Sequence, residues 1–157
     1  VPNLMKTLAH SPAALESYLT TVRLLGGGRL PPKLQEAIAI LVAQINNCEY
    51  CLSAHTFLGR RAGLDERDAE AARQAESGDA KSAAALRFAR EVVVHRGDVG
   101  PKTLDAIRRA GYEDGEIVDI VSHVALNTLT NYLNNVAGTE VDFPRVGVVF
   151  HHDASAG

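Results

Sequence analysis

The chain has 157 residues, 46% of them hydrophobic and 22% charged, and its formal net charge at pH 7 is −3. That length suits one domain over residues 1–157, with enough chain to bury a substantial core. The composition excludes a disordered chain, and the small acidic excess provides no electrostatic attraction to nucleic acid. We therefore expect a globular protein that binds no nucleic acid.

The N-terminal residues and the apolar segments also argue against a membrane protein. Residues 1–4 lack the basic and long apolar regions of a secretory signal. The longest nearly uncharged apolar run, residues 37–45, is much too short to span a bilayer. We therefore expect a cytoplasmic protein, and in that compartment two cysteines favour catalysis or metal binding over a permanent disulfide.

Residues that start and stop helices recur along the chain, whereas strand patterns are nearly absent. Proline in a first turn, as in Ser11-Pro12, and glycine after a last turn, as at Gly26, bound several segments. The only candidate strand is the apolar run Val146–Phe150. The predicted helices cover residues 12–26, 32–45, a segment from 47 or 48 to 63, 65–76, 80–96, 101–111 and 113–137.

These segments predict an all-α fold of about six to seven helices. We expect the core over about residues 32–144 and a flexible C-terminal tail over about 145–157. The third predicted helix begins beside two asparagines, and either Asn46 or Asn47 suits its cap position. Asn46 also precedes Glu49 by three residues, which is the spacing of a capping box.

The sequence repeats one pattern at two predicted helix ends, in residues 60–66 and 108–114. Each copy has two arginines, a glycine stop, an apolar residue and an acidic start. Each glycine suits the left-handed conformation past a helix end, with Leu64 or Tyr112 folding back on the last turn. An old duplication and helix-stop chemistry alone both explain the repeat.

Cys48 and Cys51 are the only cysteines, and His55 follows four residues after the second. At about 100° per residue, the three side chains share one face of an ideal helix. Free backbone N–H groups and the helix dipole at a helix start favour a thiolate, the reactive form of cysteine. His55, one turn after Cys51, is suited to take the thiol proton directly or through a water.

Glu36 lies twelve residues before Cys48, within a strongly apolar stretch. A carboxylate there is expected to be at least partly buried, and a buried carboxylate without a partner is destabilising. His55 on the following helix is the simplest partner. Such a pair would hold the imidazole in one tautomer and raise its basicity.

Three interpretations of the cysteine pair remain open. A redox-active dithiol fits the position at a helix start. A purely structural pair would pack as small apolar side chains. A zinc site would need two more ligands, for which only His151 and His152 near the C-terminus offer themselves.

These residues resemble the alkylhydroperoxidase AhpD-like branch of the carboxymuconolactone decarboxylase family. The resemblance rests on Glu36, Cys48, Cys51 and His55 in this order. It covers most of the chain from about Pro32 to Pro144, through segments that look like the family core or its peroxidase-related members: residues 46–48, 51–55, 59–64, 131–137 and 142–144.

The resemblance implies an AhpD-like helical domain that assembles as a homo-oligomer, a trimer or hexamer. It also implies a dithiol that reduces hydroperoxides without metal or other cofactor and is recycled by a thiol reductant, such as a lipoylated or thioredoxin-like protein. Carried over to this chain, Glu36 and His55 form the proton relay, and Cys48 and Cys51 form the redox pair.

Two comparisons with the family qualify this prediction. Tyr50 stands where the best-known members have a histidine, just before the second cysteine. The true decarboxylases lack the dithiol, so lactone decarboxylation is disfavoured. Spacing leaves open which sulfur attacks, because Cys48 is nearer the free N–H groups and Cys51 is nearer His55. Our interpretation takes Cys51 as the attacking thiolate and Cys48 as the resolving thiol. Cys51 becomes a sulfenic acid, and Cys48 then condenses with it to the disulfide.

A polar stripe marks the last predicted helix, which is otherwise apolar. It consists of His123, Asn127, Asn131 and Asn134, at spacings of four, four and three residues. Buried amides need partners, so the stripe either lines the reaction pocket or links subunits. We favour the subunit interface, because buried polar groups often fix register in helical assemblies.

The sequence therefore predicts a thiol-dependent (alkyl)hydroperoxide reductase. A second hypothesis is a non-enzymatic helical oligomer whose dithiol senses redox state. A third, a metal-binding module, is less favoured.

Overall fold

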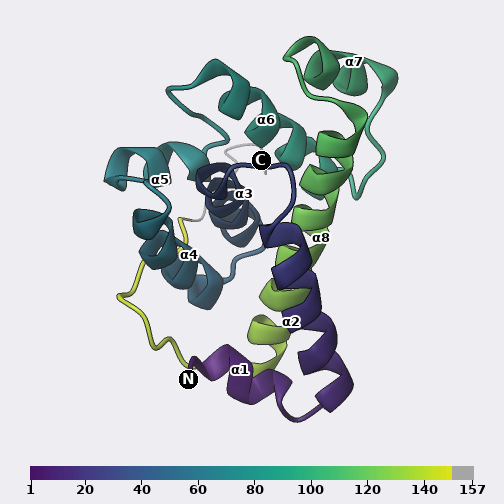
Figure 1. Cartoon of the computed structure of the whole chain (residues 1–157). Coiled ribbons are helices and arrows are strands. Elements are labelled where there is room, and N and C mark those ends of the chain that lie inside the picture. The colour runs from purple at the N-terminus through teal and green to yellow at the C-terminus, as the bar shows by residue number, and fades with distance from the viewer. Residues whose placement is uncertain (150–157) are drawn as a thin grey trace, which may run out of the picture.

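The computed structural model describes residues 1–149, which fold into eight helices and no strand (Figure 1). The prediction of an all-α fold is confirmed, with one helix more than the expected six to seven. Residues 150–157, which include His151 and His152, lie outside the described part of the chain. The helices are α1 (Asn3–Leu8), α2 (Pro12–Gly26), α3 (Pro32–Ile45), α4 (Glu49–Arg61), α5 (Glu66–Arg73), α6 (Ala80–Val94), α7 (Pro101–Arg109) and α8 (Asp114–Ala137).

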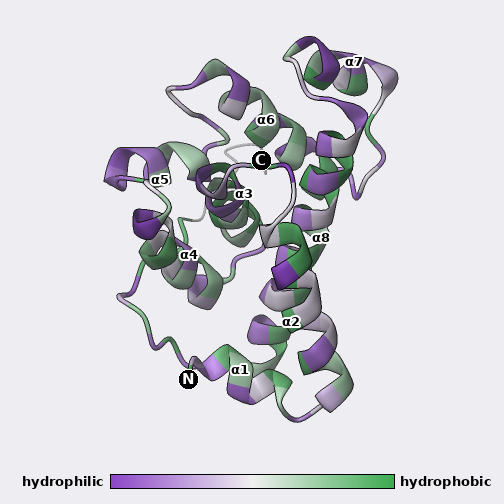
Figure 2. Ribbon diagram, in the orientation of Figure 1, coloured by the Kyte–Doolittle hydropathy of each residue, from purple (hydrophilic) through white to green (hydrophobic). Residues whose placement is uncertain are grey.

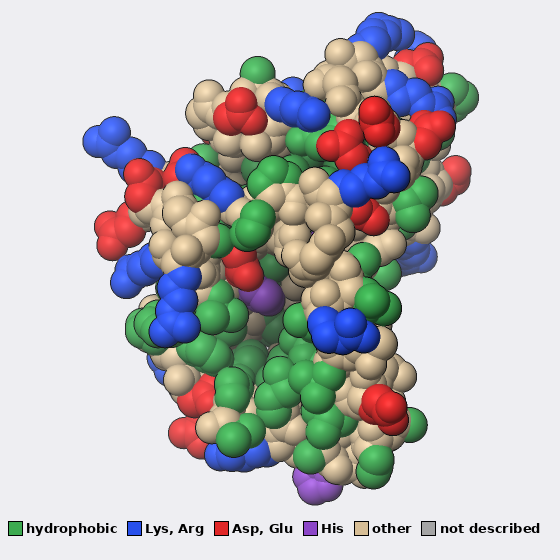
Figure 3. Space-filling model, in the orientation of Figure 1, with side chains coloured by type: hydrophobic (Ala, Val, Ile, Leu, Met, Phe, Trp, Pro, Cys, Tyr) green, Lys and Arg blue, Asp and Glu red, His purple; other side chains and the backbone are tan. Residues whose placement is uncertain are grey.

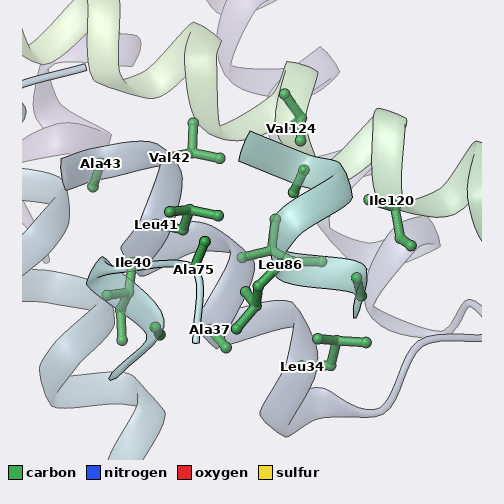
Figure 4. Close-up of a cluster of buried hydrophobic side chains, with 14 of the residues drawn as sticks. Leu34, Ala37, Ile40, Leu41, Val42, Ala43, Ala75, Leu86, Ile120 and Val124 are labelled. Carbon is green, nitrogen blue, oxygen red and sulfur yellow. The ribbon is translucent and has the colours of Figure 1, made fainter. Parts of the chain in front are cut away.

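Helix α3 lies at the centre of the molecule and contacts α4, α5, α6 and α8 (Figure 1). Residues 37–44 are all buried, so the helix needs neighbours on every side. Figure 2 shows this hydrophobic character along α3, in contrast to the largely hydrophilic α5. Figure 4 shows Leu41 of α3 in one cluster with Leu86 of α6 and Ile120 and Val124 of α8. This cluster holds the helices that carry the candidate site.

The short helix α1 was not predicted, because the sequence around it carries no cap signal. Its N-cap is Pro2, which makes no side-chain cap hydrogen bond. Tertiary contacts hold it instead: the backbone N–H of Asn3 donates to Asp142 Oδ2 over 2.8 Å, and that of Leu4 donates to the Tyr50 hydroxyl over 3.1 Å. Both partners are distant in sequence, so local patterns could not reveal this helix.

The predicted cap of the third helix is wrong. The N-cap of α4 is Cys48, whereas Asn46 is the C-cap of α3 and Asn47 has a positive φ of 53°. The two asparagines therefore form the reversal between the helices, and the side chain of Asn46 donates to Asn131 Oδ1 over 3.1 Å instead of capping α4. The connection is so short that the first cysteine itself becomes the cap.

The repeated pattern at the two helix ends folds as predicted. Gly63 and Gly111 have φ values of +93° and +95°, the left-handed region that glycine adopts without strain. Leu64 and Tyr112 then return to the interior, and each is only 5% exposed. Their backbone N–H groups donate back to Gly59 and Ile107 carbonyl oxygens over 2.8 and 3.4 Å.

The described start of the predicted tail is bound to the helices. Residues 146–149 form no strand. Instead, the backbone N–H of Val146 donates to Ser53 Oγ over 2.9 Å, Arg73 donates to the Gly147 carbonyl over 2.9 Å, and Gln44 donates to the Val149 carbonyl over 2.8 Å. These contacts join residues 145–149 to α3, α4 and α5.

Candidate active site

The two cysteines lie at the start of α4 and are buried. Cys48 is the N-cap residue and Cys51 lies in the first turn, with relative exposures of 0% and 2%. The backbone N–H of Cys51 donates to Cys48 Sγ over 3.2 Å, so sulfur takes the capping role that a serine oxygen often has. Both residues are free thiols.

The predicted contact between Glu36 and His55 forms between α3 and α4. Glu36 Oε2 lies 2.8 Å from His55 Nδ1, and 24% and 23% of the two side chains are exposed. Burial lowers the pKa of His55, but the hydrogen bond and charge of Glu36, with the charge of Cys51, raise it more, so the pKa lies above its ordinary 6.5. The protonated ring donates from Nδ1 to Glu36 and keeps Nε2–H for a reactant.

The two sulfurs differ in their ionisation. A hydrogen bond from the Cys48 thiol lowers the pKa of Cys51 from 9.0 to about 6 against the opposing effect of burial. A hydrogen bond from Asn134, the nearby amide of Asn131 and the positive charge of His55 lower it further. The pKa of Cys48 is raised, because its proton is held by the Cys51 sulfur and because it is buried. At neutral pH the site thus holds one thiolate, on Cys51.

The polar stripe of α8 faces the interior of the chain. Each of its members is at most 5% exposed: His123, Asn127, Asn131 and Asn134. Asn134 Nδ2 donates to Cys51 Sγ over 3.2 Å. The interpretation of the stripe as a subunit interface is therefore wrong, because α8 turns these side chains toward its own domain. Asn134 instead contacts the reactive site, which is the alternative that the sequence left open.

Tyr50 takes a structural position rather than a place beside the thiols. Its hydroxyl accepts a hydrogen bond from the backbone N–H of Leu4 over 3.1 Å, and its ring packs edge-on against Phe143 at 5.8 Å between centroids. Burial raises the pKa of Tyr50 to about 12. Tyr50 therefore joins α4 to α1 and to the segment after α8.

Tyr18 of α2 is a neighbour of the site that the sequence analysis missed. Its side chain is partly buried against the core. Burial raises the pKa of Tyr18, and the negative charges of Cys51 and Glu36 add to this effect. The neutral phenol of Tyr18 thus lies close enough for the charges of Cys51 and Glu36 to affect its pKa. One tyrosine on an amphipathic helix carries no sequence signal for such a role.

The surface of the molecule is hollowed on one side (Figure 3). In Figure 3 a histidine and an acidic side chain lie side by side in a hollow between the α4 and α2 sides of the molecule, with hydrophobic side chains around it. Between residues 1 and 149, no group of three or more His, Cys, Asp and Glu side chains is arranged to hold a metal ion. No helix in that range is long and apolar enough to cross a bilayer.

Fold and site together define an all-α class of protein in which a dithiol at a helix start lies beside a carboxylate–imidazole pair. A sequence profile described as the carboxymuconolactone decarboxylase family matches residues 9–91, more than half of the chain. The chain belongs to this family. The matched region contains Glu36, Cys48, Cys51 and His55.

Solved structures with the same fold include proteins named for peroxidase-related and other activities. The AhpD core of a peroxidase-related protein from Ralstonia eutropha JMP134 is 26% identical, with a TM-score of 0.83 over 90% of this chain and 77% of that one. A peroxidase-related protein from Silicibacter sp. TM1040 is 24% identical, with a TM-score of 0.79 over 93% and 77%. The debrominase Bmp8, in complex with 2,3,4-tribromopyrrole, is 19% identical, with a TM-score of 0.79 over 90% and 78%. No curated protein sequence matches the chain.

Proposed function

We propose that the protein is a thiol-dependent hydroperoxide reductase in which Cys51 attacks the peroxide. One observation carries the proposal: Cys51 Sγ, in the first turn of α4, accepts a hydrogen bond from Asn134 Nδ2 over 3.2 Å. The lowered pKa of Cys51 favours the thiolate. The pair Glu36–His55, joined over 2.8 Å, supplies a proton donor one turn away. Similarity to the AhpD core and to peroxidase-related proteins supports the same chemistry.

The first step transfers an oxygen atom to sulfur. The Cys51 thiolate attacks the hydroperoxide, so that an S–O bond forms, the O–O bond breaks and an alkoxide leaves. The proton on His55 Nε2 passes to the alkoxide, which leaves as an alcohol. Glu36 stabilises the imidazolium before this transfer. Cys51 is now a sulfenic acid, and the peroxide has accepted two electrons.

The second step closes the disulfide. The sulfur of Cys48 attacks Cys51 Sγ, the S–O bond breaks, and the hydroxyl leaves as water with the Cys48 proton. An external dithiol then restores both thiols by exchange, and in this proposal it belongs to a lipoylated or thioredoxin-like protein. A reducing compartment such as the cytoplasm would keep that partner reduced.

We also propose that the chain forms a homo-oligomer, a trimer or hexamer. The support is a set of large apolar side chains on α2 and α8 that are 48% to 88% exposed: Leu19, Leu24, Val118, Leu129, Tyr132 and Val136. Figure 3 shows further hydrophobic side chains gathered over α1 and the adjoining end of α2. Apolar surface of this extent commonly marks an interaction site.

Continuous turnover tests the proposed activity. Cumene hydroperoxide or hydrogen peroxide is supplied with dithiothreitol or a lipoylated domain as reductant. We expect Cys51→Ser to lower the rate by about 10³-fold or more, because the nucleophile is lost. Without reductant, Cys48→Ser should still consume one equivalent of peroxide but should not form the intramolecular disulfide.

Other results would support different functions. One stoichiometric oxidation without turnover would favour the redox-sensing oligomer, and near-stoichiometric zinc in the purified protein would favour the metal-binding module. Replacing peroxide with a brominated pyrrole in the same assay tests reductive debromination, the activity for which one structural neighbour is named.

A further inference from the structure

Two amide side chains of α8 approach Cys51 from the interior. Asn131 and Asn134 are 0% and 3% exposed, and three residues apart they share one face of the helix. Asn134 Nδ2 donates to Cys51 Sγ over 3.2 Å. Because amides this deeply buried normally pair all of their polar atoms, any atom left unpaired here needs an explanation.

Asn131 has such an atom. Its Oδ1 accepts a hydrogen bond from Asn46 Nδ2 over 3.1 Å, which orients the amide plane. Its Nδ2 is buried and has no partner among residues 1–149. The amide of Asn131 lowers the pKa of Cys51, so this unpaired donor lies near the sulfur. An N–H donor there can bind an oxygen that is absent from the resting thiol.

We propose that the two amides form a cradle for the sulfur of Cys51, in which Asn134 holds the thiolate and Asn131 binds the oxygen atom gained on oxidation. The second role rests on the proposed function, because the oxygen comes from the peroxide. The first role concerns the reduced protein alone. Asn134 contacts the sulfur in the reduced protein, Asn131 contacts the oxygen after oxidation, and neither exchanges a proton.

The cradle assists both steps of the cycle. In the reduced state a hydrogen bond to the charged form of sulfur favours ionisation, as other donors do for carboxylates. After oxidation, Cys48 attacks Cys51 Sγ and the S–O bond breaks. Negative charge builds up on the departing oxygen until it takes the Cys48 proton and leaves as water. A fixed N–H donor from Asn131 stabilises that charge without reorganisation.

The role of Asn134 is tested without peroxide. Cys48→Ser is the background, because serine keeps both the capping acceptor and a hydroxyl donor toward Cys51. The rate of alkylation by iodoacetamide is followed from pH 5 to pH 9.5 in this background and in Asn134→Leu. In Asn134→Leu we expect the midpoint of the pH dependence to rise by about one pH unit. Alkylation should then slow roughly five-fold at pH 6 and remain unchanged near pH 9.

A change only in the accessibility of the sulfur would give a different pattern, because it alters the rate by the same factor at all pH values. Asn134→Asp has nearly the shape of asparagine and provides a second variant if the leucine form does not fold; its negative charge should raise the midpoint further. Asn127→Leu is the matched control, since this amide donates to the carbonyl oxygen of His123 in its own helix. An unmoved midpoint in a folded Asn134 variant overturns the role of Asn134.

The role of Asn131 is tested in the chain with both cysteines. One equivalent of cumene hydroperoxide is mixed with the reduced protein, and samples are trapped with dimedone and analysed by mass spectrometry. We expect Asn131→Leu to extend the lifetime of the sulfenic acid about ten-fold while the rate of its formation changes little. An unchanged lifetime overturns the role of Asn131. If no sulfenic acid forms even in the parent protein, the proposed function and the role of Asn131 fail together, while the alkylation result still decides the role of Asn134.

Discussion

Helices α3 and α8 pack against each other, yet α3 and the second half of α8 bury different kinds of side chain. Helix α3 buries Ile38, Ile40, Leu41 and Val42, each at most 1% exposed. The second half of α8 turns amides inward and leaves Val136 88% exposed. The first arrangement is the ordinary source of stability, whereas the second is unfavourable unless the amides are paired and the apolar side chains are covered. The first half of α8 joins α3 in the core, whereas its second half serves the site and the surface.

Helix α2 differs from α3 in the same way. It has fifteen residues against fourteen in α3, but none of its residues is buried. Leu24 is 60% exposed and Leu19 is 48% exposed. Helices α2 and α8 contact each other, so their exposed apolar side chains belong to neighbouring parts of the surface. A second copy of the chain is the partner that we propose for this surface.

The largest expected effect is on stability and lies in α3. Replacing Ile40, which is 0% exposed, with alanine should lower the free energy of unfolding by about 2–5 kcal/mol, because it leaves a cavity in a fully packed site. Val136→Ala, on the exposed face of α8, should change it by less than about 0.5 kcal/mol. Urea denaturation at one low protein concentration measures both. If both substitutions lower the free energy of unfolding equally, the proposed difference in stabilisation between α3 and the second half of α8 is wrong.

An intermediate effect is expected for the carboxylate of α3. Glu36→Gln removes the charge that raises the pKa of His55, so the ring loses its proton at lower pH and the alkaline limb of the pH–rate profile moves down. The peroxidase rate at pH 7 should therefore fall about ten-fold or more.

The chain provides a matched control for this variant. Glu91 of α6 and His95, its C-cap residue, form another carboxylate–imidazole pair over 3.2 Å, with 44% and 53% of their side chains exposed. Glu91→Gln should therefore leave the pH–rate profile unchanged. If Glu36→Gln does not change the pH–rate profile, the pair Glu36–His55 does not control the reaction.

The smallest effect on the chain itself is expected on the outer face of α8. Leu129 and Tyr132 are 52% and 58% exposed, so Leu129→Glu with Tyr132→Glu should leave the helical content unchanged. If a second copy covers this face, the introduced charges should lower the molecular mass measured by light scattering at micromolar concentration. Lys102→Glu on α7 is the control for added negative charge. An unchanged mass would place the interface elsewhere.

Local chemistry explains which helix ends could be predicted. Pro12 after Ser11 and the glycines at 63 and 111 act within a few residues, and the structure uses them as expected. The cap of α4 was wrong because Asn46 had two competing uses, and its contact with Asn131 on α8 lies outside any local pattern. Helix α1 was missed for the same reason, since residues near 140 hold it in place.

The sequence by itself determined the helical fold, the dithiol at a helix start and the pairing of Glu36 with His55, because a carboxylate in an apolar helix requires a nearby partner. Only the tertiary structure decided that Asn134 contacts Cys51, because 83 residues separate the two and the periodicity of α8 does not say which of its faces turns inward. It also decided that Tyr50 bonds to α1 and not to the thiols. The pattern of side chains along a helix indicates which of its groups must be buried or paired. The packing of helices that are distant in sequence decides which residues become their partners.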